Sequence, residues 1–157
     1  MDEATVCYPI TDGETLLIRK QRGVGAGKLV GPGGRVEPDE TPDDCVRREV
    51  REELRVEPVG VERVGEIEFH FRTPDPDDDS MYVYVYTAEG VRGEPEATPE
   101  AVPVWHPTDQ LPYEEMWADD RIWMPHMLDG HTFTGQFVLT DDGEALAEYS
   151  VTLDVSV

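Results

Sequence analysis

The sequence predicts an α+β fold, with a mixed β-sheet flanked by helices, in a single domain that spans residues 1–157. Three observations lead to this expectation. Strand-like segments are spread along the whole chain, two other segments have helical patterns, and the length suits one domain. The clearest strand signal lies in residues 80–88, where Tyr82, Tyr84 and Tyr86 alternate with valines in the two-residue period of a strand.

The expected strands span residues 4–10, 14–20, 61–71, 80–88, 102–106, 132–139 and 146–153. Between the third and fourth of these, the acidic run at residues 75–79 is expected to form a hairpin turn. Residues 94–103 are rich in proline and are expected to form a loop, which contains Glu100.

The first helix is predicted over residues 42–54. Thr41 is a suitable N-cap, and Pro42 suits the first helical turn. Val46, Val50 and Leu54 recur every four residues, so they form an apolar stripe that can face a sheet. A second helix is predicted over residues 119–128, starting at two adjacent aspartates.

Three glutamates share another side of the first helix. Glu49, Glu52 and Glu53 lie at i, i+3 and i+4, where like charges repel unless a cation lies among them. A hard divalent ion such as Mg²⁺ prefers oxygen ligands and often bridges carboxylates to phosphates, so the glycine-rich turn before the helix suggests a diphosphate ligand. The alternative is a solvated acidic helix face, because the chain contains 35 acidic residues.

The spacing of this motif resembles the Nudix box of the Nudix hydrolases. The matching residues are Gly34, Glu40, Arg48, Glu49, Val50, Glu52, Glu53 and Val56. The family has glycine where this chain has Arg55, so either the helix ends differently here or the chain bears the cost of a left-handed cap, roughly 1–2 kcal/mol. Residues 22–28, 64–67 and 116–125 also resemble the oxidised purine nucleoside triphosphatases of this family, in an acidic, halophile-like version.

This resemblance implies a Nudix fold, which is an α/β/α sandwich with a mixed central β-sheet. It also implies a hydrolase that uses Mg²⁺, or Mn²⁺ as the alternative. Its substrates would be oxidised purine nucleoside triphosphates such as 8-oxo-dGTP, converted to the monophosphate and pyrophosphate in nucleotide-pool sanitation. The implied metal-binding residues are Gly34, Glu49, Glu52, Glu53 and Glu100. The implied catalytic residues are Glu52, Glu53, Arg48 and Glu100, with Glu40 in a supporting position.

For the base, the resemblance implies stacking on Trp117 and edge recognition by Asp119 and Asp120; the alternative is an ordinary helix start with a packed tryptophan. Phe69 and Thr5 also match pocket positions of the family, and Lys20 and Val30 complete the expected substrate-binding residues. The family has an asparagine at Val30, a tryptophan at Leu29 and a phenylalanine at Val24, so base specificity stays open. The alternatives are a Nudix hydrolase of ADP-ribose or dinucleoside polyphosphates, or a non-catalytic nucleotide-sensing module.

The net charge of −22 and the pI near 4.2 suit a protein that stays soluble in concentrated salt, and we expect its activity to survive there. Residues 19–63 contain ten basic and ten acidic residues, so positive charge is concentrated around the expected phosphate site. Lys20, Arg22, Lys28 and Arg35 either meet the triphosphate or balance the helix acids. The rest of the chain is strongly acidic and would repel phosphates, which argues against duplex nucleic acid as a partner.

No apolar run reaches the length of about 18 residues that suggests a membrane helix, and no signal peptide is recognised, so we expect a cytoplasmic protein with a small nucleotide as its partner. A monomer is the default expectation. Cys7 and Cys45 are expected to be free thiols. The four histidines lack close metal-ligand spacing and are expected to be structural or at the surface; they are His70, His106, His126 and His131.

Overall fold

The computed structural model describes residues 1–23, 25–72, 80–140 and 144–157, so Val24 and the hairpin turn expected at residues 75–79 lie outside the described residues. Its helices are α1 (Pro42–Leu54) and α2 (Asp120–Leu128), and a short 3-10 helix spans Tyr113–Glu115. The strands are β1 (Asp2–Thr11), β2 (Glu14–Lys20), β3 (Leu29–Val30), β4 (Gly33–Arg35), β5 (Glu57–Val59), β6 (Glu62–Phe71), β7 (Met81–Ala88), β8 (Gly90–Arg92), β9 (Ala101–Pro107), β10 (Phe133–Leu139) and β11 (Leu146–Leu153).

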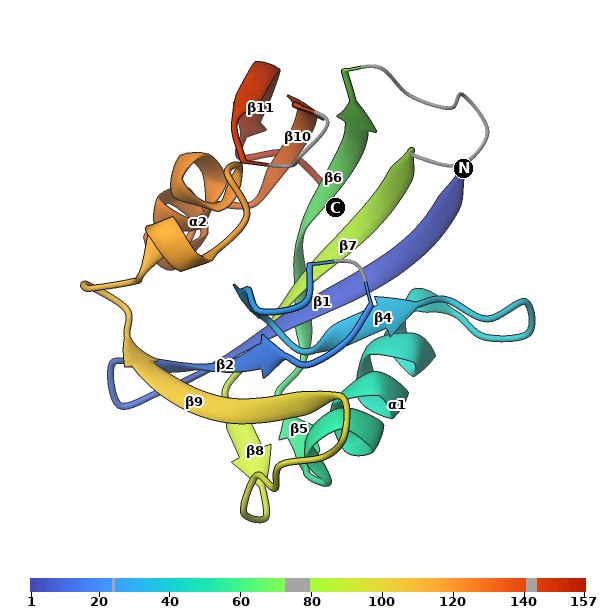
Figure 1. Ribbon diagram of the computed structural model, residues 1–157, viewed down its shortest axis with the longest axis vertical. Coiled ribbons are helices and arrows are strands. Elements are labelled where there is room, and N and C mark those ends of the chain that lie inside the picture. The colour runs from blue at the N-terminus through green and yellow to red at the C-terminus, as the bar shows by residue number, and fades with distance from the viewer. Residues whose placement is uncertain (24, 73–79, 141–143) are drawn as a thin grey trace.

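The main sheet is mixed, as predicted. Its strands follow the order β11-β10-β6-β7-β1-β2-β3, with β4 paired to β1 and β9 paired to β2. The β1–β7 and β6–β10 pairs are parallel, and the other pairs of this sheet are antiparallel. Strands β5 and β8 form a separate antiparallel pair. In Figure 1, α1 and α2 lie on opposite sides of the central strands, which confirms the expected α/β/α arrangement.

All seven expected strands and both helices are present, with ends that differ from the predicted ones by at most two residues. The prediction missed β3, β4, β5 and β8. These strands are two or three residues long, too short to show a two-residue period. Two of them begin with glycine, which has low strand propensity.

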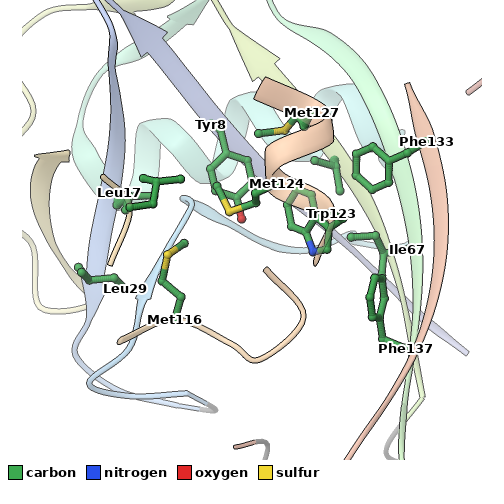
Figure 2. Close-up of a cluster of buried hydrophobic side chains, with 12 residues drawn as sticks. Tyr8, Leu17, Leu29, Ile67, Met116, Trp123, Met124, Met127, Phe133 and Phe137 are labelled. Atoms are coloured by element: carbon green, nitrogen blue, oxygen red, sulfur yellow. The ribbon is translucent and has the colours of Figure 1, made fainter. Parts of the chain in front are cut away.

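The sheet separates two hydrophobic clusters. Neighbouring residues such as Cys7 and Tyr8 enter opposite clusters because side chains alternate between the two faces of a strand. The cluster beneath α2 is centred on Trp123, whose ring lies 5.7 Å from Tyr8 and 5.2 Å from Phe133, centroid to centroid. Figure 2 shows these side chains filling the space between α2 and the sheet, with Met124 beside them.

Helix α1 begins and packs as its sequence predicts. The Thr41 hydroxyl accepts a hydrogen bond from the Asp44 amide, and the Asp44 carboxylate accepts one from the Thr41 amide, which completes a capping box. Val46, Val50 and Leu54 are fully buried in the second cluster. This anchors one side of α1 on the sheet and turns Glu49 and Glu53 toward β4.

Arg55 ends α1 in a left-handed conformation, with φ 60° and ψ 35°, and its amide donates to the Arg51 carbonyl. Of the two possibilities left open by the sequence, the helix therefore keeps the cap and bears its cost. We expect Arg55→Gly to raise the free energy of unfolding by about 0.5–1 kcal/mol, because glycine adopts this conformation without a Cβ clash. Chemical denaturation measures this change.

The matched control is Arg47→Gly, at an exposed position inside α1. Glycine in a helix interior lowers stability by about 1 kcal/mol, so the two substitutions should change stability in opposite directions. A loss of stability in both variants would contradict this account of the cap.

Candidate functional site

One side of α1 faces the glycine-rich strand β4, and Glu53 lies buried between them. The Glu53 residue is 5% exposed, and its Oε1 accepts a hydrogen bond from the Gly33 amide at 2.7 Å. A Cβ on Gly33 would lie 2.0 Å from the Thr5 carbonyl oxygen, so only glycine fits here. The close approach of β4 to β1 thus presents a backbone amide to a carboxyl group on the helix.

Glu49 lies one helical turn before Glu53 and packs directly on Gly34. A Cβ on Gly34 would lie 2.4–2.6 Å from the atoms of the Glu49 carboxyl group. The absence of a side chain at Gly34 therefore makes room for this carboxylate against the backbone of β4. Three of the predicted metal-binding residues, Gly34, Glu49 and Glu53, thus lie around one short stretch of backbone.

Arg48 connects the other acidic residues of the motif. Its guanidinium binds Glu40 through two hydrogen bonds, Nε to Oε2 at 2.9 Å and Nη2 to Oε1 at 2.6 Å. These bonds lower the pKa of Glu40 to about 2. Arg48 Nη1 also donates to Glu49 Oε1 at 2.8 Å and to Glu52 Oε2 at 3.1 Å. Glu40 thus fixes the guanidinium, which in turn orients Glu49 and Glu52.

Two residues from other segments act electrostatically on this cluster. Glu100, which directly precedes β9, adds to the rise in the pKa values of Glu49 and Glu53 through its negative charge. Its exposed carboxylate pairs with Arg22 at 3.3 Å. Lys20, at the end of β2, acts in the opposite direction, and its positive charge lowers the pKa of Glu53. The fold therefore brings Glu100 and Lys20 toward the helix glutamates.

The buried carboxyl groups of this cluster hold protons more tightly than free glutamates. Burial raises the pKa of Glu53 to about 8, and the charges of Glu49 and Glu100 contribute to the rise. Burial also raises the pKa of Glu49. The negative charges of these neighbouring carboxylates repel one another, so a cation bound between them would stabilise their ionised forms. Their hard oxygen donors suit a divalent ion such as Mg²⁺.

Protein donors hold these carboxylates in the structure. Gly33 binds Glu53, and Arg48 binds Glu49 and Glu52. Within the described residues, no three His, Cys, Asp or Glu side chains form a ready-made metal-binding group. The chemistry of the set still fits a divalent ion, and the groups that would hold it are the carboxylates of Glu49 and Glu53 and the carbonyl of Gly34.

A second group of predicted residues lies near the loop between β2 and β3. The Trp117 indole packs so closely on Gly25 that a Cβ there would lie 2.8 Å from ring atom Cζ2. Gly25 also has φ +81°, a conformation that side chains rarely adopt. Lys28 Nζ lies 5.0 Å from the centre of the Trp117 ring. This flat aromatic surface can stack on a nucleobase.

Asp119 and Asp120 are buried at the start of α2, next to this surface. Asp119 holds the N-cap position without a capping hydrogen bond, and its Oδ2 instead accepts the indole N–H of Trp123 at 2.8 Å. Its Oδ1 has no hydrogen-bond partner among the described residues. Burial raises the pKa of Asp119 to about 6 and that of Asp120 well above its usual range. The two carboxyl groups interact, so one retained proton makes the pair both a donor and an acceptor.

The raised pKa of Asp120 has a consequence for stability. A carboxyl group whose pKa is higher in the folded state than its unfolded value of about 3.9 stabilises the fold at low pH, and this contribution is lost as pH rises. Asp120→Asn replaces it with a neutral amide. We therefore expect the difference in Tm, Asp120→Asn minus the unmodified chain, to be more positive at pH 8 than at pH 5. Thermal unfolding at both pH values measures this, with exposed Asp109→Asn as the charge control. A difference that is the same at both pH values would contradict it.

Two predicted pocket positions face away from Trp117. The Thr5 hydroxyl lies 3.3 Å from Cys45 Sγ on the α1 side of β1, and Val30 packs against the cluster on that same side. Phe69 does belong to the cluster beneath α2, where it stacks on Phe137 with ring centres 6.0 Å apart. The structure therefore brings Phe69, but neither Thr5 nor Val30, to the α2 side of the sheet.

The sequence interpretation missed Gly33 and Tyr8. The doublet of glycines before Arg35 is a signal for a close backbone approach, which β4 makes. Tyr8 is buried, and the neighbouring charges of Asp120 and Asp119 add to the effect of burial in raising its pKa. The two-residue period of β1 places it on the α2 side.

The expected phosphate-binding cations separate into different places. Lys20 lies near Glu53, whereas Lys28 lies at Trp117 and also lowers the pKa of Asp120. Arg22 and Arg35 form exposed ion pairs, with Glu100 at 3.3 Å and Asp2 at 2.7 Å.

The remaining residues named from the sequence lie outside the glutamate cluster, except Cys45. His70 contacts Glu68 and Ser80, and His131 contacts Asp154. His106 lies in β9 and His126 in α2, where its ring is 6.2 Å from that of His131. Cys7 and Cys45 are buried free thiols, and Cys45 Sγ lies 3.5 Å from the Gly34 carbonyl oxygen. Neither α1 nor α2 is long and apolar enough to cross a membrane.

Comparison with known proteins gives consistent matches. Residues 1–127 match the model of the family described as the NUDIX domain. A protein of Danio rerio named oxidized purine nucleoside triphosphate hydrolase is 37% identical to this chain, and the match covers 85% of this chain and 83% of that protein. A protein of Mus musculus with the same name is 36% identical, and the match covers 94% of this chain and 92% of that protein. The crystal structure of a mutator MutT protein from Bacillus halodurans has a TM-score of 0.84 at 25% identity, covering 96% of this chain and 97% of that one.

Proposed function

This chain belongs to the Nudix family of hydrolases, and from this membership we propose that it converts purine nucleoside triphosphates to the monophosphate and pyrophosphate. We propose oxidised purines such as 8-oxo-dGTP as the preferred class, since relatives covering most of the chain carry the name oxidized purine nucleoside triphosphate hydrolase. The role would be nucleotide-pool sanitation, by a monomeric cytoplasmic enzyme of one domain that uses Mg²⁺ or Mn²⁺.

One observation carries this proposal. The buried Glu53 carboxyl, with its pKa raised to about 8, lies with Glu49 against the glycines of β4, and Arg48 orients the neighbouring acids. Burying ionisable carboxyl groups together is costly unless a ligand uses them. Such a ligand would be a divalent cation with the phosphates that it accompanies.

Different residues of the site would have different roles in the reaction. Glu49, Glu53 and the Gly34 carbonyl would hold the cation, which supplies Lewis-acid activation of a phosphoryl oxygen and lowers the pKa of the attacking water. Glu52 and Glu100 are the acids left to accept the proton from that water, since their side chains stay 60% and 55% exposed. Lys20 lies near Glu53 and would balance negative charge on the phosphates.

The base would occupy the second group of residues. Trp117 would stack on the purine, and the Asp119–Asp120 pair would present one proton and free carboxyl oxygens to its edge. A guanine-type edge carries both N–H donors and carbonyl acceptors, so a pair of this kind can satisfy it.

Product identification tests the reaction. The protein is incubated with dGTP and Mg²⁺, and the products are separated by ion-exchange chromatography. We expect dGMP and pyrophosphate, with no turnover after the cation is removed by a chelator. Formation of dGDP and inorganic phosphate would contradict the diphosphatase assignment, because it places the cleaved bond at the γ-phosphate.

The acidic surface supports a halophilic setting. Outside residues 19–63 the chain carries three basic and 25 acidic residues. At about 1 M salt the Debye length is near 3 Å, so this charge no longer repels a polyanionic substrate. We expect the KM for dGTP to fall, or at least not to rise, between 0.1 and about 2 M KCl. Steady-state kinetics across this range measure it, and a steep loss of activity above about 1 M would argue against this setting.

A further inference from the structure

Lys28 is an unusual cation in this chain, which has only two lysines. Its backbone is fixed by hydrogen bonds, from its amide to the Gly25 carbonyl at 2.9 Å and from the Lys20 amide to its own carbonyl at 3.0 Å. Its side chain is only 17% exposed, although lysine side chains usually reach into solvent. The Lys28 side chain therefore lies mostly within the protein, where its ammonium group can meet a bound ligand.

That place is the proposed base pocket. Lys28 Nζ lies 5.0 Å from the centre of the Trp117 ring, and it is close enough to Asp120 to lower the pKa of that carboxyl group. Nζ also donates to Glu144 Oε1 at 3.0 Å, from the segment just before β11. An ammonium group has three N–H donors and no acceptor, so among the described residues its hydrogen bond to Glu144 leaves donors for a ligand.

A purine edge has a matching requirement. Guanine presents the acceptors N7 and O6, and its 8-oxo form keeps the O6 acceptor, whereas adenine has N7 and a donor amino group at position 6. Val30 cannot donate a hydrogen bond, and its side chain packs on the other side of the sheet. Carboxyl groups are mainly hydrogen-bond acceptors, and Asp119 Oδ2 already accepts the Trp123 N–H, so Asp119 and Asp120 can satisfy few acceptors on the base. Lys28 is the donor that the described part of the pocket places beside Trp117.

Building on the proposed function, we propose that Lys28 determines base specificity. When a purine stacks on Trp117, the Lys28 ammonium group moves from over the ring to the edge of the base and donates a hydrogen bond to a carbonyl oxygen there. It would favour bases with a carbonyl group at this edge, such as guanine and its 8-oxo form, over adenine. The adenine amino group and the Lys28 ammonium group are both donors, so neither would find a partner. Unpaired donors in a buried site weaken the binding of adenine relative to guanine by a large factor.

The test compares dGTP with dATP for the unmodified chain and three variants. Lys28→Met removes the donors but keeps an unbranched apolar side chain near Trp117. Lys28→Arg keeps a cationic donor. Arg92→Met removes one positive charge from the exposed end of β8 and controls for net charge. We expect Lys28→Met to lower the dGTP to dATP ratio of kcat/KM by at least about tenfold, Lys28→Arg to keep it within about threefold, and Arg92→Met to leave it unchanged.

Binding of dGMP and dAMP, measured by isothermal titration calorimetry without metal, gives a second readout that needs no turnover. The ratio of the two Kd values should change in Lys28→Met by a similar factor. An unchanged ratio in both assays would overturn the role of Lys28. If the proposed function is wrong, the unmodified chain will hydrolyse no purine triphosphate. The ratio of the Kd values for dGMP and dAMP still tests whether Lys28 recognises the base.

Discussion

Replacing Glu53 by glutamine is expected to lower kcat for dGTP hydrolysis by about 10³-fold, because the site loses a charged oxygen ligand whose contribution is several kcal/mol. The amide keeps an oxygen that can accept the Gly33 hydrogen bond. The variant should therefore fold. Steady-state kinetics with Mg²⁺ at saturating substrate measure the effect.

Thermal unfolding separates a lost ligand from a damaged fold. The folded pKa of Glu53, about 8, lies above its unfolded value of about 4.3, so its ionised form destabilises the native state at high pH. Without metal, Glu53→Gln should match or exceed the Tm of the unmodified chain at pH 9. It should also lose the Tm increase that Mg²⁺ gives the unmodified chain. Glu57→Gln, at an exposed ion pair with Arg51, serves as the control and should behave as unmodified. Full activity in Glu53→Gln would refute the proposed metal site.

Trp117→Ala is expected to lower kcat/KM for purine triphosphates by about 10- to 100-fold, since stacking of one base on an aromatic ring contributes about 1–3 kcal/mol. The loss should fall mainly on KM, because the glutamate cluster that acts on the phosphates is a separate group of residues. Kinetics with dGTP and 8-oxo-dGTP measure the change for both bases.

Two further variants make this result specific. Trp117→Phe keeps an aromatic face and should retain most of the activity. Trp105→Ala removes a tryptophan that is 37% exposed on β9 and should leave the kinetics unchanged. If Trp117→Ala hydrolyses purine triphosphates as well as the unmodified chain, stacking on Trp117 plays no part in recognition.

The sequence predicted α1 and its glutamates well because the relevant signals are local. The Thr41 cap, the apolar stripe and the offsets of Glu49, Glu52 and Glu53 all lie within one helix, where position along the chain determines direction in space. The long strands were predicted for the same reason. The mixed topology and the family came from the resemblance, and the sheet order and the NUDIX match confirm them.

Features that depend on contacts between distant segments could not be predicted in this way. The Gly33 amide reaches Glu53 only because β4 pairs with β1, and Lys28 meets Glu144 across 116 positions of sequence. The resemblance places Thr5 and Val30 at pocket positions, but their contacts lie on the α1 side of the sheet, which the sequence alone does not show.

The most direct test of the central claim is a competition assay with equal concentrations of 8-oxo-dGTP, dGTP and ADP-ribose, Mg²⁺ and high salt. The relative rates of consumption give the ratios of kcat/KM. We predict that 8-oxo-dGTP disappears first, that dGTP follows, and that pyrophosphate forms in step with the monophosphates. Preferential consumption of ADP-ribose would contradict the account. The site would then prefer a diphosphate derivative, and the proposed recognition of an oxidised purine by Trp117, Asp119 and Asp120 would not explain its specificity.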